Sequence, residues 1–233
     1  MPIPSYYRAS IDQSRARIDQ SRAGAPRPAL GGALDAEVCV IGAGFAGLAT
    51  ALGLLERGVG SVVVLEAEQV GHGASGRNGG FVFGGYSLGC AALLKQLGRE
   101  RARHLYGLTL GAVDTIRARI RDYGIDCDAV DAGVILANWF DDDKALLATR
   151  EFMLREFNTD WRFVPREALR EQLKTGRYFG GLLEGNAFHF HPLKYALGLA
   201  RVIEAKGGKI HEQSRVTGIE AEVLRLAAKR WQQ

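Results

Sequence analysis

Three glycines, Gly42, Gly44 and Gly47, stand where the chain could bind a phosphate group. In the stretch VIGAGFAGLA they form the pattern G-x-G-x-x-G. Such a turn lets the backbone approach a pyrophosphate closely, and the N–H groups that open a following helix complement its negative charge. The pattern is weak by itself, so the elements on either side decide what it means.

Those elements predict a strand, a helix and a second strand. The run EVCVIG, residues 37–42, is typical of a buried strand, and SVVVLE, residues 61–66, of another. Between them apolar residues recur at helical spacing up to Gly58 and Gly60, which end the helix. The members of this helical face are Phe45, Leu48, Ala49, Leu52 and Leu55. A strand, helix and strand over about thirty residues predict a βαβ unit with parallel strands.

Glu66 completes the dinucleotide-binding pattern. It lies at the end of the second strand, 19 residues after Gly47. A carboxylate there can accept hydrogen bonds from ribose hydroxyls, and its charge would repel a 2′-phosphate, which disfavours NADP. The alternative for Glu66 is an ordinary exposed strand end.

A second glycine cluster, VGHGASGRNGG at residues 70–80, comes directly after this strand. A loop that leaves the second strand of such a sheet emerges at its carboxyl edge, where ligands bind. The flexible, polar segment favours a cofactor longer than NAD, whose ribityl chain and ring pass along the backbone. The alternative is a glycine-rich surface loop.

The remaining pattern is mixed. Helices are predicted over 91–123 with a break at Gly98, and over 141–157, 164–173 and 192–208; a strand pair is predicted in 127–139, two short strands in 180–192 and a strand-like stretch over 209–220. Residues 1–33 are rich in Pro, Ser, Arg and Gly, and IDQSRAR at 11–17 is nearly repeated at 18–24. This segment predicts a flexible leader. The tail AEVLRLAAKRWQQ has a helical pattern with no obvious partner.

The composition excludes several classes of function. Of 233 residues 47% are hydrophobic and 24% charged, and no apolar run is long enough to span a bilayer. The net charge of +4 is scattered, so nucleic acid is not an expected partner. Cys39, Cys90 and Cys127 lack metal-ligand or redox spacing, which fits a cytoplasmic location, and Cys39 is expected to be a small buried hydrophobe. His189 and His191 make too few ligands, so no metal is expected.

Three motifs carry a family resemblance. DAEVCVIGAGFAGLATALGLLERG, VVVLEAEQVGHGASGRNGG and FHPLKYALGLARVIEAKGGKIHEQSRVTGIE resemble FAD-dependent oxidoreductases of the D-amino-acid oxidase superfamily, and within it the gamma-glutamylputrescine oxidoreductase-like group. The leader pieces SYYRAS and PRPAL are similar too. The resemblance covers nearly all of residues 34–220.

The resemblance implies an α/β fold: a Rossmann-like FAD-binding βαβ domain, interrupted by an α+β substrate domain and incomplete at the C-terminus. The implied divisions are a flexible leader (1–33), the first part of the FAD-binding domain (34–85), a partial substrate domain (86–185), a return to the FAD-binding domain (186–220) and an atypical tail (221–233). Members of the family continue well past this point, so a truncated chain is expected.

The resemblance also implies the cofactor contacts. The pyrophosphate of FAD would lie over 42–47, its ribose on Glu66, its ribityl chain and ring along 74–80, and its adenine near the backbone of Val216. The implied residues are Gly42, Gly44, Phe45, Ala46, Gly47, Glu66, Ala67, Ala74, Ser75, Arg77, Asn78, Gly79, Gly80 and Val216. A surface salt bridge is the alternative role for Arg77. His72 is one position away from the histidine that binds flavin covalently in some relatives, so covalent attachment is not expected.

The implied reaction is oxidation of an amine or amino acid, gamma-glutamylputrescine-like, to an imine, with hydride transfer to the flavin and electrons passing to oxygen or another acceptor. No catalytic residue can be identified in the sequence. Two alternatives stay open: a truncated, catalytically inactive FAD-binding remnant, and a nicotinamide-dependent dehydrogenase.

Overall fold

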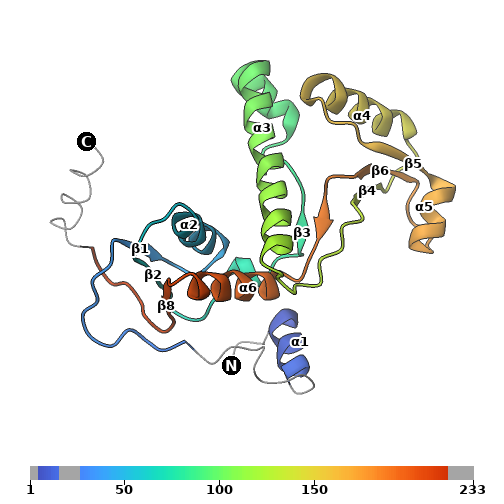
Figure 1. Ribbon diagram of the computed structural model, residues 1–233. Coiled ribbons are helices and arrows are strands. Elements are labelled where there is room, and N and C mark those ends of the chain that lie inside the picture. The colour runs from blue at the N-terminus through green and yellow to red at the C-terminus, as the bar shows by residue number, and fades with distance from the viewer. Residues whose placement is uncertain (1–4, 16–26, 220–233) are drawn as a thin grey trace. The chain divides into compact units, whose positions relative to one another are not determined.

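The computed structural model of the chain describes residues 5–15 and 27–219 (Figure 1). They fall into two compact units. Unit 1 takes its described residues from Met1–Asn78 and Pro192–Gln233, and unit 2 is Gly79–His191. The chain therefore leaves unit 1 once and returns to it once.

Unit 1 is built on a parallel sheet. Its strands are β1 (Val38–Ile41), β2 (Val62–Leu65) and β8 (Lys209–His211), in the order β1-β2-β8. Helix α2 (Phe45–Glu56) connects β1 to β2, and both strand pairings are parallel. The predicted βαβ unit is therefore present, with the strand pairing that its hydrophobic pattern implies.

Two helices bury the core of unit 1. Helix α2 packs on β1 and β2, while α6 (Pro192–Ala205) packs on β8 and lies beside α2 (Figure 1). Leu48 and Leu52 of α2 and Ile203 of α6 are fully buried. Pro192 begins α6, where its missing N–H costs no helical hydrogen bond, as the sequence predicted.

Strand β1 forms as predicted, but the prediction that it is buried is wrong. Its residues alternate between partly buried and exposed, with Cys39 exposed and Ile41 56% exposed. The reason is coverage: α2 packs on β1, and the alternating exposure means that the described residues leave the other face of the strand open. An apolar run predicts burial on both faces only when other elements cover both of them.

The leader also differs from the prediction of a flexible segment. Helix α1 (Tyr6–Arg15) forms within it and packs against α6, and Ile11 is buried. Residues 27–30, which we call the strap, hydrogen-bond to other parts of unit 1. The second copy of the repeated heptad and the tail at 221–233 lie outside the described residues.

Unit 2 contains two antiparallel sheets and three helices. The strands β4 (Val134–Asn138), β6 (Gly180–Glu184) and β5 (Arg162–Pro165) form one sheet in the order β4-β6-β5, and β3 (Phe81–Val82) pairs with β7 (Phe188–His189). The helices are α3 (Cys90–Asp122), α4 (Asp143–Phe157) and α5 (Arg166–Leu173). The helix-and-strand mixture predicted for this region is present.

Helix α3 is kinked at Gly98, as predicted, because this residue has the non-helical angles φ 75° and ψ 167°. The Asp142 side chain caps α4 by accepting the N–H of Ala145 at 3.0 Å. A hydrophobic cluster joins the two helices through Leu93, Ala102, Tyr106, Met153 and Phe157.

Two strand predictions are confirmed only in part. Residues 127–139 contain one strand, β4, whose partner is β6; Val130 makes only an isolated bridge to His189. Asp128 and Gly133 have positive φ angles, so the extended conformation is interrupted on both sides of Val130 and no second strand forms within the stretch. Similarly, β8 ends at His211 since Gln213 has φ 50°, so Val216 lies outside any strand.

None of the helices in the described part of the chain is both long enough and apolar enough for a membrane span.

Candidate nucleotide site

The first glycine segment makes a sharp turn between β1 and α2. Gly42 has φ +95°, and its N–H donates to the carbonyl of Leu65 at the end of β2 (2.8 Å). A Cβ on Gly47 would overlap the carbonyl oxygen of Gly42 and lie 3.4 Å from Cγ1 of Val40. Only glycine fits at position 47, because any side chain would push α2 away from the turn.

The N-terminus of α2 offers main-chain donors. Gly44 is the N-cap and supplies no side-chain acceptor, and the first turn contains no acidic residue. Among the hydrogen bonds of the described residues, none takes the N–H groups of Ala46 or Gly47. Together with the helix dipole, these donors favour an anion.

Glu66 lies against this turn. Its Oε2 accepts the N–H of Ala43 at 2.7 Å, and its Oε1 accepts the N–H of Glu68 at 2.9 Å. The main chain of Glu66 is fixed as well, through hydrogen bonds with the carbonyl of His211 and the N–H of Ser214. Each carboxylate oxygen keeps a further lone pair, so the side chain can still accept a hydroxyl from a sugar. Ala67, the next residue, is partly buried.

The second glycine segment lies directly on the first. The N–H of Gly71 donates to the carbonyl of Ala43 at 3.0 Å, and the N–H of Phe45 donates to Oγ of Ser75 at 2.9 Å. A Cβ on Gly76 would overlap the carbonyl oxygen of Gly71 and lie 3.2 Å from Cδ1 of Leu193 in α6. Close packing therefore explains the glycines at 71 and 76.

The predicted polar contacts of the second segment have different local roles. Ser75 satisfies the first N–H of α2. The amide of Asn78 donates to the carbonyls of Ala74 and Ser75 and closes the one-turn helix η2 (Ala74–Gly76). Arg77 is exposed, and no ion pair with it is found within residues 5–15 and 27–219, so its alternative role as a surface salt bridge has no support there. His72 is exposed as well.

The other predicted site residues divide between the two units. Gly79 and Gly80 begin unit 2, where the carbonyl of Gly80 accepts the N–H of Phe190 at 2.9 Å. Val216 is partly buried in unit 1 after the end of β8. Unit 1 thus brings together 42–47, Glu66 and 74–78, whereas Gly79 and Gly80 belong to unit 2.

Sequence reasoning missed Glu212, which is 8% exposed. Its Oε1 accepts the N–H of Val70, the first residue of the second glycine segment, at 2.9 Å. Glu212 occurs in a polar stretch after β8 that carries no recognisable motif. The only signal near it was the similarity of PRPAL, whose residues 27–30 form the strap beside it.

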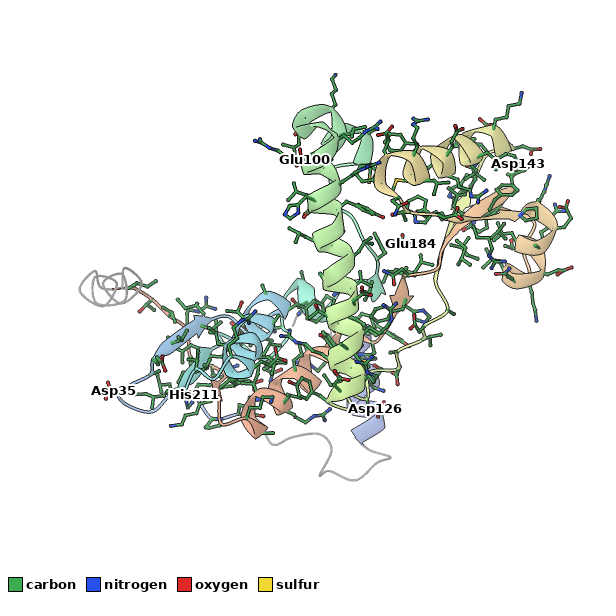
Figure 2. All side chains as sticks on the ribbon, turned by 45° about the horizontal axis from the view of Figure 1, so that its top comes forward. Asp35, Glu100, Asp126, Asp143, Glu184 and His211 are labelled. Carbon is green, nitrogen blue, oxygen red and sulfur yellow. The ribbon has the colours of Figure 1, made fainter. Side chains whose placement is uncertain are left out.

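Sequence reasoning also missed a buried carboxyl in unit 2. Glu184, the last residue of β6, is 4% exposed, and its Oε1 accepts the N–H of Gly84 at 3.4 Å (Figure 2). Burial raises the pKa of this carboxyl. Burial, assisted by the charge of Glu184, also raises the pKa of Tyr106 to about 12. Glu184 and Tyr106 are two buried acidic groups of unit 2 that its sequence pattern did not reveal.

The arrangement in unit 1 fits a nucleotide diphosphate. A Cβ on Gly42 would meet nothing within 4 Å, and one on Gly44 would meet only Ser75 Oγ and Cβ, so the main-chain surface of the turn is bare. The turn keeps the free N–H groups of Ala46 and Gly47, and Glu66 contacts the same turn through the N–H of Ala43. Donors for phosphate beside an acceptor for sugar hydroxyls are the two requirements of dinucleotide binding.

Comparison with known proteins shows the family of the chain. The model of the DAO family, described as FAD dependent oxidoreductase, matches residues 37–232. Gamma-glutamylputrescine oxidoreductase of Escherichia coli (strain K12) is 37% identical over 219 residues, which cover 93% of this chain and 48% of that protein. A probable oxidoreductase, OrdL, of Haemophilus influenzae is 40% identical over 182 residues, covering 78% of this chain and 42% of that protein. The chain thus spans about half the length of these relatives.

Solved structures share the fold. The L-amino acid deaminase of Proteus myxofaciens, solved in complex with anthranilate, superposes with a TM-score of 0.65 and 25% identity, over 84% of this chain and 43% of that one. Glycine oxidase of Bacillus cereus gives a TM-score of 0.58 at 19% identity, over 80% of this chain and 48% of that one. At that identity the second likeness concerns the fold alone.

Proposed function

Because the chain belongs to the family of FAD-dependent oxidoreductases, we propose that it takes part in the oxidation of an amine or amino acid, with FAD held in the nucleotide site of unit 1. FAD is the cofactor of this family. The observation that carries the proposal is the bare turn at 42–47, which keeps free amide donors at the start of α2 and is contacted by the carboxylate of Glu66.

Each part of the site then has a task. The N–H groups of Gly44, Ala46 and Gly47 bind the diphosphate, and Glu66 accepts the ribose hydroxyls. The N–H of Phe45 already donates to Ser75, so Phe45 takes part only as a residue of the turn. Ala67 and Val216 lie toward the adenine, while Ala74, Arg77, Asn78, Gly79 and Gly80 line the path of the ribityl chain and ring.

Unit 1 is, in this proposal, a Rossmann-like FAD-binding domain, and unit 2 is a partial α+β substrate domain inserted into it. The parallel order β1-β2-β8 and the return of the chain to unit 1 at Pro192 support the interpretation. When bound, FAD supplies a two-electron acceptor for oxidation of the substrate's C–N bond to an imine, which water hydrolyses. The protein binds and orients both reactants.

The finer assignments are proposals as well. Relatives include an enzyme named for gamma-glutamylputrescine, so a gamma-glutamylputrescine-like amine is the proposed substrate class. Oxygen or another acceptor takes up the electrons, the location is the cytoplasm, and nucleic acid is not a partner.

The test begins with binding. Purified protein is titrated into FAD while flavin fluorescence is monitored. In a parallel titration the protein is added to NADH, and the fluorescence of the reduced nicotinamide is monitored. We expect quenching of FAD and no binding of NADH. Binding of NADH without FAD would overturn the cofactor assignment and favour a nicotinamide-dependent dehydrogenase.

Turnover is tested next. Putrescine-type amines and amino acids are added to the FAD-loaded protein, and peroxide and the reduction of an artificial electron acceptor are both measured. Peroxide or dye reduction with an amine supports amine oxidation. Tight FAD binding with neither product would contradict that activity and identify an inactive FAD-binding remnant.

A further inference from the structure

The strap, residues 27–30, is anchored by a nearly buried arginine. The side chain of Arg27 is 10% exposed, and its Nε and Nη2 donate to the two carboxylate oxygens of Glu204 in α6 at 2.6 and 2.9 Å. A two-pronged contact of this kind fixes both the position and the orientation of the guanidinium. A flexible leader would not bury an arginine in this way.

The same guanidinium faces a second carboxylate. Nη1 of Arg27 lies 3.8 Å from Oε1 of Glu212, and the side chain of Glu212 is also 10% exposed. A buried carboxylate is costly unless charge or hydrogen bonds compensate it. For Glu212 the compensation is the charge of Arg27 and the N–H of Val70, at 2.9 Å from the same oxygen.

Two more contacts connect the strap to the last residue of β8 and to the segment after it. The N–H of Leu30 donates to Oγ of Ser214 at 2.8 Å, and Nδ1 of His211 lies 3.2 Å from the carbonyl oxygen of Pro28 (Figure 2). Ser214 in turn donates its own N–H to the carbonyl of Glu66 at 2.8 Å. Ser214 therefore connects the strap to Glu66, and Glu212 connects it to Val70.

We propose that the strap is a working part of the nucleotide site: Arg27 and Glu212 are positioning residues that hold Val70, and with it the second glycine segment, in the conformation that receives the cofactor. This inference rests on the proposed function. The glycines of 71–76 leave the backbone free to take many conformations, and ordering them before the cofactor arrives reduces the entropy lost on binding. Glu212 hydrogen-bonds to Val70, the residue directly before these glycines, and so fixes the start of the segment.

The test uses four variants of the full chain. Glu212→Ala removes the acceptor of the Val70 N–H, while Glu212→Gln keeps an oxygen that can accept it and removes only the charge. Arg27→Ala removes the strap's anchor. Arg215→Ala is the matched control, because Arg215 belongs to the same segment but forms an exposed ion pair with Glu68.

Two quantities are measured for each variant: the FAD dissociation constant, and hydrogen exchange of the 70–80 backbone in the FAD-free protein. We expect Glu212→Ala to weaken FAD binding about 10- to 100-fold, the range for loss of a hydrogen bond to a charged group. Glu212→Gln should recover most of that loss. Arg27→Ala should weaken binding about 10-fold, and Arg215→Ala less than about 2-fold.

Exchange in 70–80 should accelerate in Glu212→Ala and Arg27→Ala, and remain unchanged in the control. A lower melting temperature with unchanged FAD affinity and unchanged exchange in 70–80 would show that the strap only stabilises the fold, and would overturn the inference. Failure of the unmodified protein to bind FAD would contradict the proposed function instead. If Glu212→Ala does not fold, Arg27→Ala and Glu212→Gln decide the question.

Discussion

Residues 42–47 and 71–76 have the same glycine spacing, GAGFAG and GHGASG, and begin with the same backbone geometry. In both, the first glycine has a positive φ angle, 95° for Gly42 and 69° for Gly71. In both, a Cβ on the sixth residue would overlap the carbonyl oxygen of the first. The shared pattern specifies a tight reversal in which one backbone passes directly over another.

The two segments open different helices. The first opens α2, a helix of 12 residues, whereas the second opens η2, a 3-10 helix of three. Only a full helix aligns enough peptide dipoles to favour an anion at its N-terminus. The second segment instead supplies Ser75, which hydrogen-bonds to the first turn of α2. The glycine pattern therefore identifies a turn, and the element after it determines whether that turn can bind phosphate.

The largest effects should come from the sixth residue of each segment. Gly47→Ala and Gly76→Ala both force a methyl group into a carbonyl oxygen that belongs to the backbone and cannot yield easily. We expect each to lower the free energy of unfolding by about 3 kcal/mol, the upper range for overpacking. Urea unfolding measures the loss. A well-tolerated Gly76→Ala would show that the two turns are not equivalent.

Glu66→Ala should separate the segments by function. It removes the acceptor of the N–H groups of Ala43 and Glu68 together with the proposed ribose contact. We expect FAD affinity to fall by about 1–3 kcal/mol. Glu68→Ala is the matched control, since that exposed carboxylate pairs with Arg215 and should leave the affinity nearly unchanged. Equal affinities of the two variants would contradict the role given to Glu66.

Ser75→Ala tests the link between the segments. The Phe45 N–H loses its acceptor, as when a helix loses its cap, and we expect a loss of about 1 kcal/mol in the free energy of unfolding. FAD affinity should fall with it, because the second segment is then free to move from the first. Calorimetric melting and fluorescence titration report the two effects. An unchanged melting temperature would mean that water replaces the hydroxyl at no cost.

The smallest effect is expected at Gly73. A Cβ there would meet nothing within 4 Å, and φ is −78°, so neither a clash nor a left-handed backbone opposes a side chain. Gly73→Ala should therefore change stability by less than about 0.5 kcal/mol. A large loss of FAD affinity in this stable variant would show that the cofactor itself passes over Gly73, which would sharpen the contrast with Gly47 and Gly76.

Local patterns predicted much of unit 1. The apolar spacing from Phe45 to Leu55 and the β-branched run at 62–64 favour a helix and a strand through local signals, so the βαβ unit could be inferred from them. The exposure of Cys39 could not, because burial depends on what covers a strand. Nor could the strap, since Arg27 meets Glu204 and Glu212 across about 180 residues of sequence.

In unit 2, sequence patterns predicted the elements and missed their partners. Each helix carries local signals, such as the cap at Asp142 and the break at Gly98. Strand pairing is a long-range property, and β4 pairs with β6 some forty residues later rather than with a neighbour. The burial of Glu184 is a result of that pairing, so its raised pKa could not be inferred from the residues around it.

The outer side of β1 has a practical consequence. In the described part of the chain, Val38–Ile41 pair on one side alone, and the apolar side chain of Ile41 stands beside that unmatched row of amide and carbonyl groups. Such a row recruits further strands from any chain that meets it. Concentrated solutions of the purified chain should therefore turn cloudy, and a lysine introduced at Ile41 should keep them clear.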